Sequence, residues 1–195
     1  MIGIRAAAAL LTLAVILQWA VPGHLIRRGQ QTLEQGTAYR FRTAPVDPVD
    51  PFRGRYVALD FEAARVPLPR GQGGYRRGQR VYAPIRVDDG GDAVLGAPLR
   101  QPPESGDWLE ATVLWVNADE LRLRLPFDRY YLDEHHAPEV ERRYRDTNRM
   151  PADGEDPRRP AWAQVRVRNG YALIEMLYVD GRPVSELMRE PAASL

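Results

Sequence analysis

The chain has 195 residues, of which 44% are hydrophobic and 27% charged; this is the composition of a folded protein and excludes wholesale disorder. Its net charge is only +1 and it shows no basic, aromatic-rich face, which argues against a nucleic-acid-binding module. It contains no cysteine, so disulfides, thiolate catalysis, cysteine-bound metals and a lipoprotein anchor are excluded.

The first predicted element is a transmembrane helix from Ala6 to Ile26, after a short tail at 1–5. No charged residue occurs between Ala6 and Gly23. As a helix this uncharged stretch rises about 27 Å, close to the ~30 Å hydrocarbon core of a bilayer. Trp19 suits the far headgroup layer, and Arg27 with Arg28 ends the span. The pattern predicts a single span that anchors the chain in membrane lipid.

A cleaved signal peptide is the main alternative. It requires small residues just before its cleavage site, and Gln18, Ala20 and Pro22 fit that requirement poorly. We therefore expect a retained helix. Arg5 on one side and the pair 27–28 on the other leave the positive-inside rule nearly balanced. A short tail followed by a large domain favours a bacterial inner (cytoplasmic) membrane protein whose soluble domain is extracytoplasmic.

A connector at 27–36 is predicted to lead to a soluble domain at 37–185, with a flexible tail at 186–195. In this domain apolar residues recur mostly with a period of two, which is typical of strands. Strands are predicted at 37–43, 55–61, 81–87, 108–116 and 121–125. Of these, 108–116 is apolar on both faces, as in a central strand.

Particular residues refine these predicted strands. Pro84 demotes its run to an edge strand or a bulge, because proline cannot donate to a sheet. In the run 121–125, leucines alternate with Arg122 and Arg124, which predicts a half-buried strand with exposed arginines. Asn169-Gly170 between two apolar runs predicts a β-hairpin with a type I′ turn, and Asp180-Gly181 marks another turn.

One short helix is predicted near 138–146. Pro138 suits its first turn, and glutamate–arginine pairs at i,i+4 spacing support it. The whole pattern predicts a mainly β protein. A single N-terminal transmembrane helix precedes an antiparallel β domain, a sandwich or partly closed barrel, with this one short helix.

The most distinctive segment precedes and enters the second predicted strand. Two Asp-Pro pairs, at Asp47 and Asp50, impose extended or turn geometry, and Gly54 permits a bulge or a close backbone approach. One interpretation is a rigid corner held by Asp47, Asp50 and Arg53. The other is a binding edge, at which Arg53 and Tyr56 present donors to a partner.

This segment resembles the GDYXXLXY family of bacterial membrane-anchored proteins. The stretch Gly54-Arg55-Tyr56-Val57-Ala58-Leu59-Asp60-Phe61 matches the motif except at Arg55, where the motif has Asp, and at Phe61, where it has Tyr. The N-terminal helix and the late hairpin extend the resemblance over most of the chain. It implies an accessory protein that acts beside a multi-spanning membrane protein, and it implies no activity. If the motif Asp is catalytic or a metal ligand, Arg55 removes that function.

Other residues were weighed as sites. His135 and His136 are adjacent and diverge in either a strand or a helix, so we expect no metal and no cofactor. The aromatic residues Phe127, Tyr130, Tyr131 and Tyr144 form either a ligand platform or the core and rim of the domain.

We therefore expect a non-enzymatic, membrane-anchored accessory or binding module that acts with another membrane or envelope protein. One alternative is an envelope hydrolase that uses Asp47, Asp50, Asp133 and Glu134 as paired carboxylates. Another is a module that binds a glycan or small ligand without turnover.

Overall fold

The computed structural model describes residues 3–44, 56–68, 73–117, 119–132, 140, 142–144, 147 and 161–189. It is mainly β, with antiparallel sheets behind an N-terminal helix, so the predicted fold class is confirmed. The elements in chain order are α1 (Ile4–Gln35), β1 (Thr37–Ala44), β2 (Tyr56–Ala58), β3 (Asp60–Phe61), η1 (Glu62–Ala64), β4 (Arg65–Pro67), β5 (Arg80–Val87), β6 (Ala93–Leu95), β7 (Trp108–Val116), β8 (Glu120–Arg124), β9 (Arg129–Tyr131), β10 (Trp162–Arg168), β11 (Tyr171–Val179), β12 (Arg182–Pro183) and α3 (Val184–Leu187).

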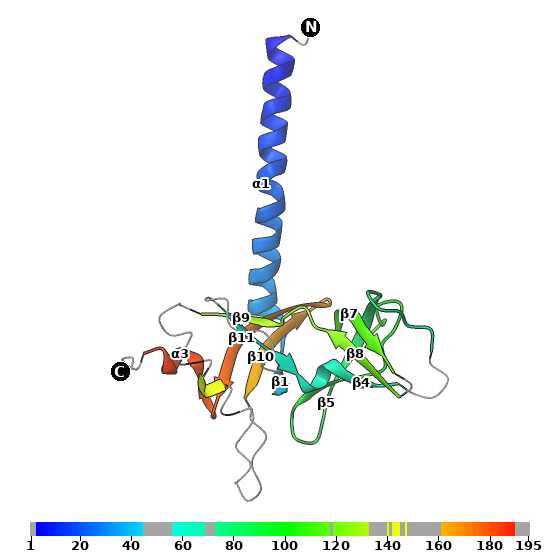
Figure 1. Cartoon of the computed structure of the whole chain (residues 1–195). Coiled ribbons are helices and arrows are strands. Elements are labelled where there is room, and N and C mark those ends of the chain that lie inside the picture. Colours follow the sequence, from blue (N-terminus) through cyan, green and yellow to red (C-terminus); the bar gives the residue numbers. More distant parts are fainter. Residues whose placement is uncertain are drawn as a thin grey trace, which may run out of the picture.

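Helix α1 stands upright on the β domain, with the N-terminus at its far end (Figure 1). Within the described chain it is the one helix long and apolar enough to cross a membrane. Its large apolar side chains are exposed on every side, which in water would be costly. The most exposed of them are Leu11, Leu13, Ile16, Leu17, Trp19 and Ile26.

The helix is longer than the predicted span, because residues 27–35, which belong to the predicted connector, continue it as further helical turns. Its 32 residues rise about 48 Å, against about 30 Å of hydrocarbon. The last turns are helical where they pack on the β10–β11 hairpin. Thr32 is buried there, and the Arg28 guanidinium lies 4.4 Å from the centroid of the Tyr171 ring.

The first sheet has the strand order β12-β11-β10-β1-β3. Asn169 and Gly170 have φ angles of 49° and 74°, so the predicted type I′ hairpin between β10 and β11 is confirmed. Asp180 and Gly181 also have positive φ angles and turn the chain from β11 into β12, as predicted. Local sequence alone specifies these two turns, because few residues tolerate positive φ.

The second sheet has the order β4-β8-β7-β5-β6, with β7 at its centre as predicted. The prediction that Pro84 marks an edge strand or bulge is wrong, since β5 lies between two partners and pairs without a register shift. It pairs with β7 through residues 80–84 and with β6 through 85–87. The Pro84 carbonyl accepts the Gly96 N–H at 2.8 Å, so its missing donor faces away from β7 and costs no bond to β7.

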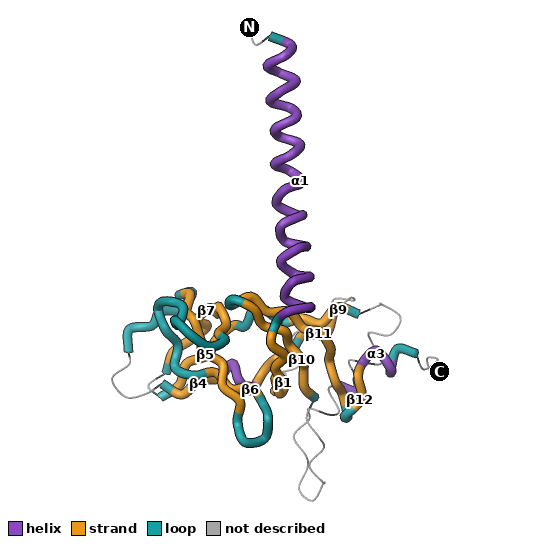
Figure 2. Tube along the Cα trace, turned by 180° about the vertical axis from the view of Figure 1, so that it is seen from behind, coloured by secondary structure: helices purple, strands orange, loops and turns teal. Residues whose placement is uncertain are grey.

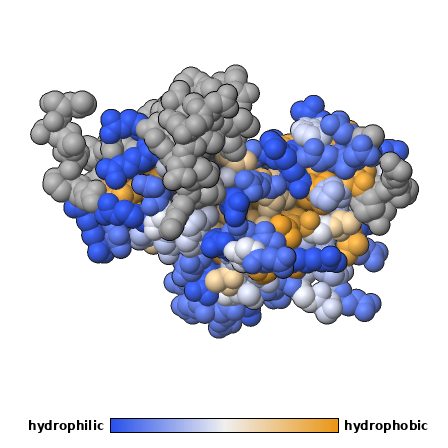
Figure 3. Space-filling model, turned by 90° about the horizontal axis from the view of Figure 1, so that it is seen from below, coloured by the Kyte–Doolittle hydropathy of each residue, from blue (hydrophilic) through white to orange (hydrophobic). Residues whose placement is uncertain are grey.

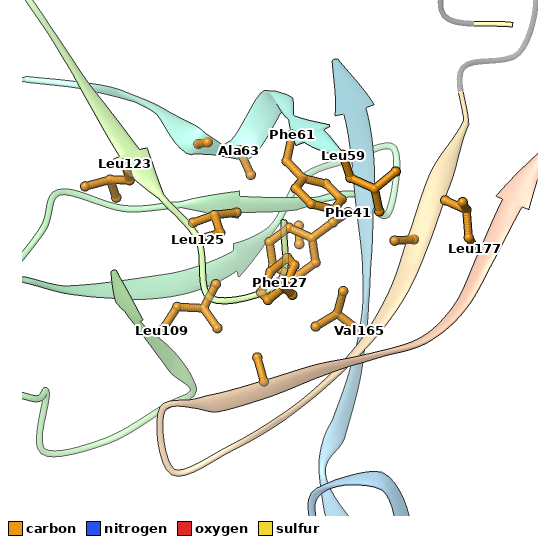
Figure 4. Packing of buried hydrophobic residues seen from close by; sticks show 14 of the residues in the cluster. Phe41, Leu59, Phe61, Ala63, Leu109, Leu123, Leu125, Phe127, Val165 and Leu177 are labelled. Carbon is orange, nitrogen blue, oxygen red and sulfur yellow. The ribbon is translucent and has the colours of Figure 1, made fainter. Parts of the chain in front are cut away.

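The hydrophobic core lies between the two five-stranded sheets (Figure 4). Three phenylalanines meet at its centre: Phe41 from β1, Phe61 from β3 and Phe127 from the segment after β8. Their ring centroids are 5.1–6.1 Å apart in edge-to-face geometry, the favoured arrangement of aromatic pairs. This cluster joins residues up to 86 positions apart in sequence, from Phe41 to Phe127, into one core.

The predicted short helix near 138–146 lies partly within the described residues. Residues 140, 142–144 and 147 are helical. Val140 and Tyr144, four residues apart and therefore on one face of a helix, are both buried in the main core. The rest of the predicted range lies outside the described residues.

Candidate functional site

The segment 56–67 passes through all three sheets of the domain in twelve residues. Strand β2 pairs with β9, and the Leu59 N–H donates to the Asp128 carbonyl at 2.9 Å. Strand β3 then pairs with β1 in the first sheet, and β4 pairs with β8 in the second. The predicted single strand at 55–61 is therefore two short strands with a break at Leu59. The segment fastens the two large sheets to each other.

One face of this segment is part of the core. Val57, Leu59 and Phe61 are all buried, as the alternation predicts. Phe61 belongs to the phenylalanine cluster, and Leu59 lies beside it (Figure 4). These side chains stabilise the crossing and are not available to a ligand.

The other face of β2 reaches the surface at Tyr56. Its ring lies edge-to-face with Tyr131 at a centroid distance of 5.9 Å, and the Arg129 guanidinium lies 5.0 Å from the Tyr56 ring centroid. A hydrogen bond with Tyr131, aided by the charge of Asp128, raises the pKa of Arg129. The result is an exposed patch of two tyrosines and an arginine. The other residues of the predicted binding corner, Asp47, Asp50, Arg53 and Gly54, lie outside the described residues, as does Arg55.

Asp60 accepts a hydrogen bond from Arg122 of β8, and the two form an ion pair between β3 and β8. The sequence predicts an exposed Arg122, but the residue is only 9% exposed because Asp60 compensates its charge. Arg122 Nη1 is buried and has no hydrogen-bond partner among the residues that the structure describes. The pair was missed because its members are 62 positions apart.

A pocket of about 360 Å³ opens between η1, β4 and β6. Its apolar lining comes from Ala63, Pro67, Ala93, Val94 and Leu95, and its polar lining from Arg42, Glu62, Arg65, Asp88 and Asp92. The loop between β5 and β6 that borders it lies at the end of the domain away from the helix (Figure 2). Seen from that end, the domain shows an apolar area bordered by hydrophilic residues (Figure 3).

Asp92 is the buried carboxylate of this pocket, with 5% of its surface exposed. It accepts hydrogen bonds from Arg40 and Arg42, which project from β1 in the other sheet. The Arg42 Nε also lies 3.9 Å from a Glu62 carboxylate oxygen. The Asp92 amide donates to Asp88 Oδ1 at 2.8 Å, which closes the β5–β6 turn.

This arrangement suits binding better than acid–base catalysis. Both carboxylate oxygens of Asp92 are already engaged by guanidinium groups, one by Arg40 and the other by Arg42. Alternation in β1 placed Arg40 and Arg42 on one face, but nothing in the local sequence pointed to Asp92, 50 residues away from Arg42. The pocket offers an apolar floor and a rim of mixed charge.

The aromatic residues weighed as a ligand platform separate into core and surface. Phe127 and Tyr144 are buried in the core, Tyr130 packs against it half-buried, and Tyr131 is 69% exposed. Burial raises the pKa of Tyr130. Among the residues that the structure describes, no three histidine or acidic side chains gather as a metal site. His135 and His136 lie outside them, as do Asp133 and Glu134.

A family model described as GDYXXLXY protein matches residues 18–177 of this chain. The chain belongs to the GDYXXLXY family. No curated protein and no solved structure matches it significantly.

The motif that gives the GDYXXLXY family its name extends into the segment 56–67, which joins the sheets. The motif leucine is Leu59, and the last aromatic position is Phe61; both are core residues of the segment that joins the sheets. The first motif tyrosine, Tyr56, is instead partly at the surface with Arg129 and Tyr131. Two of these three motif positions thus serve folding, and one is accessible to a partner.

Proposed function

We propose that this protein is a single-pass accessory module of the bacterial inner membrane. Helix α1 anchors it, and the β domain lies on the extracytoplasmic side, where it acts with another membrane or envelope protein. The observation that carries the proposal is the apolar surface of α1, which the domain leaves uncovered. A bilayer satisfies such a surface at a length that fits the span.

The junction between helix and domain supports an accessory role. The last turns of α1 pack on β10 and β11, so the domain is fixed to its anchor and is not tethered by a flexible linker. Gln31 accepts a hydrogen bond from Arg168 at 3.5 Å, and the Gly36 carbonyl accepts one from Arg166 at 3.2 Å. A domain held in this way keeps a fixed orientation to the membrane and to a neighbour in it.

Reporter fusions after Arg189, combined with partner capture, test this proposal. An alkaline phosphatase, which is active only outside the cytoplasm, is expected to be active, and a fluorescent protein that folds only inside is expected to be dark. Extraction in gentle detergent is expected to recover the chain with an integral membrane protein. Recovery as a lone monomer, or the reverse reporter pattern, would contradict the proposal.

A second candidate function is the binding of a small polar ligand or glycan, favoured by the pocket beside Asp92. Val94 lies in its lining and is 39% exposed, so Val94→Arg narrows the pocket with little cost to the core. A panel of monosaccharides and amino acids is expected to include a compound that raises the Tm of the wild type and not of Val94→Arg. A panel without effect on either protein would remove this candidate.

The envelope hydrolase remains the enzymatic alternative. Its acidic residues lie outside the described residues, so no geometry favours it. Hydrolytic activity that is lost in Asp47→Asn or Asp133→Asn would replace the accessory function with this one.

A further inference from the structure

Two polar groups of one residue, the side-chain amide and the backbone carbonyl of Gln18, lie in the transmembrane part of α1. Gln18 is the polar side chain nearest to the middle of the span, about 3 Å from the midpoint of 6–26. Pro22 lies four residues later and has no N–H, so the helical hydrogen bond to the Gln18 carbonyl is missing. The Gln18 side chain is exposed and makes no hydrogen bond within the described chain.

A bilayer core offers no water to these groups. Backbone and side-chain polar groups in hydrocarbon need protein partners, and glutamine often finds one on a neighbouring helix. At 100° per residue, Gln18 continues the stripe of α1 that docks on the domain. That stripe, whose members lie within about 40° of the Gln18 direction, consists of Leu11, Ala14, Gln18, Pro22, Leu25, Gly29 and Thr32.

The lower end of the stripe is occupied by the domain. Thr32 is buried, and a Cβ built at Gly29 would lie 3.7 Å from Leu173 Cδ1 of β11. The helix runs on without a visible break above this contact (Figures 1 and 2). Gln18 therefore faces the space directly above the β10–β11 hairpin.

We infer that the stripe around Gln18 and Pro22 is the docking site for a transmembrane helix of another protein, one that presents a hydrogen-bonding side chain near the middle of the bilayer. This inference rests on the proposed function and specifies its partner. The incoming helix ends at the membrane surface, above the hairpin. Its donor reaches the Gln18 carbonyl, and its side chain pairs with the Gln18 amide.

A second copy of this chain is a poorer occupant. Two parallel copies meeting at Gln18 would each bring a hairpin to the side of the helix that faces the partner. Each hairpin is about 10 Å thick, and the axes of two packed helices are only about 8–10 Å apart. The gap between the helices therefore has no room for two hairpins. Gln18 lies only about 17 Å above Gly29 along the axis, too short a distance for the helices to diverge around two hairpins.

Photo-crosslinking of the full chain in native membranes tests the inference. A benzophenone amino acid at Leu11 or Leu25, on the stripe, is expected to form one adduct with another integral membrane protein. The same probe at Leu13 or Ile16, which lie about 140–160° away from Gln18, is expected to form none. The adduct must remain in carbonate-washed membranes.

Three variants make the result specific. Gln18→Leu is expected to lower the adduct yield about three- to thirtyfold, the range of interhelical hydrogen bonds in membranes. The matched control Ile16→Gln/Gln18→Leu keeps one glutamine in the span but moves the amide to the opposite face, and it is expected not to restore the yield. Pro22→Ala, which returns an N–H to the Gln18 carbonyl, is expected to lower the yield less.

Several results would overturn the inference: adducts with the mass of two copies, equal adducts from all four positions, none at all, or a yield indifferent to Gln18→Leu. Such a result leaves the proposed function standing if the chain resists the carbonate wash and is captured with a membrane protein. Loss of the chain from washed membranes would instead remove the proposed function.

Discussion

Gly170 lies against the indole of Trp108, at the point where the first sheet meets the second. A Cβ at this position would lie 2.0 Å from Trp108 Cζ3, and the residue has a φ angle of 74°. The Gly170 carbonyl also accepts the Glu110 N–H at 3.4 Å. The hairpin turn is thus a contact between the sheets as well as a connection between strands.

Gly170→Ala is therefore expected to lower the free energy of unfolding by about 2–4 kcal/mol, from positive-φ strain and overpacking together. Gly181→Ala is the matched control, because Gly181 has a φ angle of 77° but open space around it. It is expected to cost only the strain, about 1–2 kcal/mol. Urea unfolding of the detergent-solubilised chain measures both; equal losses would contradict a role for Trp108.

Asp92, like Gly170, joins the two large sheets, because it accepts hydrogen bonds from Arg40 and Arg42 of β1. Asp92→Asn removes the negative charge that Arg40 and Arg42 share and leaves Arg42 with the 3.9 Å pair to Glu62. We expect a loss of about 1–3 kcal/mol in the free energy of unfolding, below the value for fully buried pairs because both arginines are partly exposed. Glu110→Gln removes an exposed pair with Arg80 and is expected to cost less than about 1 kcal/mol. A loss at Asp92 no larger than at Glu110 would show that the pocket pair is not structural.

Tyr39 makes the stability of the folded protein depend on pH in the alkaline range. Its hydroxyl donates to Asp107 Oδ2 at 2.9 Å, and burial, this bond and the Asp107 charge raise its pKa to about 12. Since the folded pKa exceeds the unfolded value of 10.0, the stabilisation is complete below pH 10 and is lost as the pH rises to about 12. The chain has no lysine and no cysteine, so other side-chain titrations in this window come from tyrosine.

Tyr39→Phe is expected to flatten the fall in unfolding free energy between pH 10 and 12. Asp107→Asn keeps an acceptor but removes the charge, and it is expected to give an intermediate slope. Urea titrations at fixed ionic strength measure the three slopes. Identical slopes in wild type and Tyr39→Phe would exclude this origin of the pH dependence.

At the scale of elements, a single residue, Gly36, connects α1 to β1. A Cβ at Gly36 would lie 2.4 Å from the Thr32 carbonyl oxygen and 3.0 Å from that of Val167, and backbone atoms cannot move aside easily. The Gly36 N–H donates to Thr32 at 2.9 Å and ends the helix. The strand therefore leaves the helix without a linker.

Gly36→Ala is expected to loosen this junction and to make trypsin cleave at least severalfold faster at Arg27 and Arg28, which are exposed but held in the helix. Gly23→Ala lies in the same helix with open space around it and is expected to have no effect. Mass spectrometry of timed digests identifies the cut. Equal rates for the two variants would contradict a rigid junction.

The elements that sequence predicted well are those specified locally. Positive φ at Asn169 and Gly170 follows from two residues, and the strands β1, β7 and β8 follow from short apolar runs. The helical state of 27–35 was not predictable in this way, since β10 and β11, far along the chain, cover its last turns.

The site shows the same limit more strongly. Burial of Arg122 depends on Asp60, and the charge of Asp92 is met from another sheet, so neither follows from periodicity. Tyr56 was predicted to be part of a binding edge, and the structure places it partly at the surface with Arg129 and Tyr131; that it binds a partner stays a prediction. The predicted strand is broken at Leu59 because its first half pairs with β9 and its second half with β1. Only the assembled sheets determine this change of partner.

For the whole molecule, the length of α1 sets how the domain meets the membrane. The residues from Arg27 to Gln35 add about 13 Å of helix beyond the span. In the proposed anchored arrangement, the domain would thus lie close to the headgroups, with the β10–β11 turn toward the bilayer and the pocket beside Asp92 at the opposite end (Figures 1 and 2). The proposed membrane partner would then meet one end of the domain, and the second candidate function, ligand binding, would use the other.

Cysteine labelling in intact cells tests the anchored arrangement most directly, because the natural chain has no cysteine. Gly3→Cys and Asp89→Cys mark the two ends of the molecule, and both positions are exposed. With the outer membrane permeabilised, a membrane-impermeant maleimide is expected to label Asp89→Cys at once and Gly3→Cys only after lysis, on a chain of undiminished mass. Labelling of Gly3→Cys in intact cells, protection of Asp89→Cys, or loss of the N-terminal residues from the mature chain would contradict a retained single span.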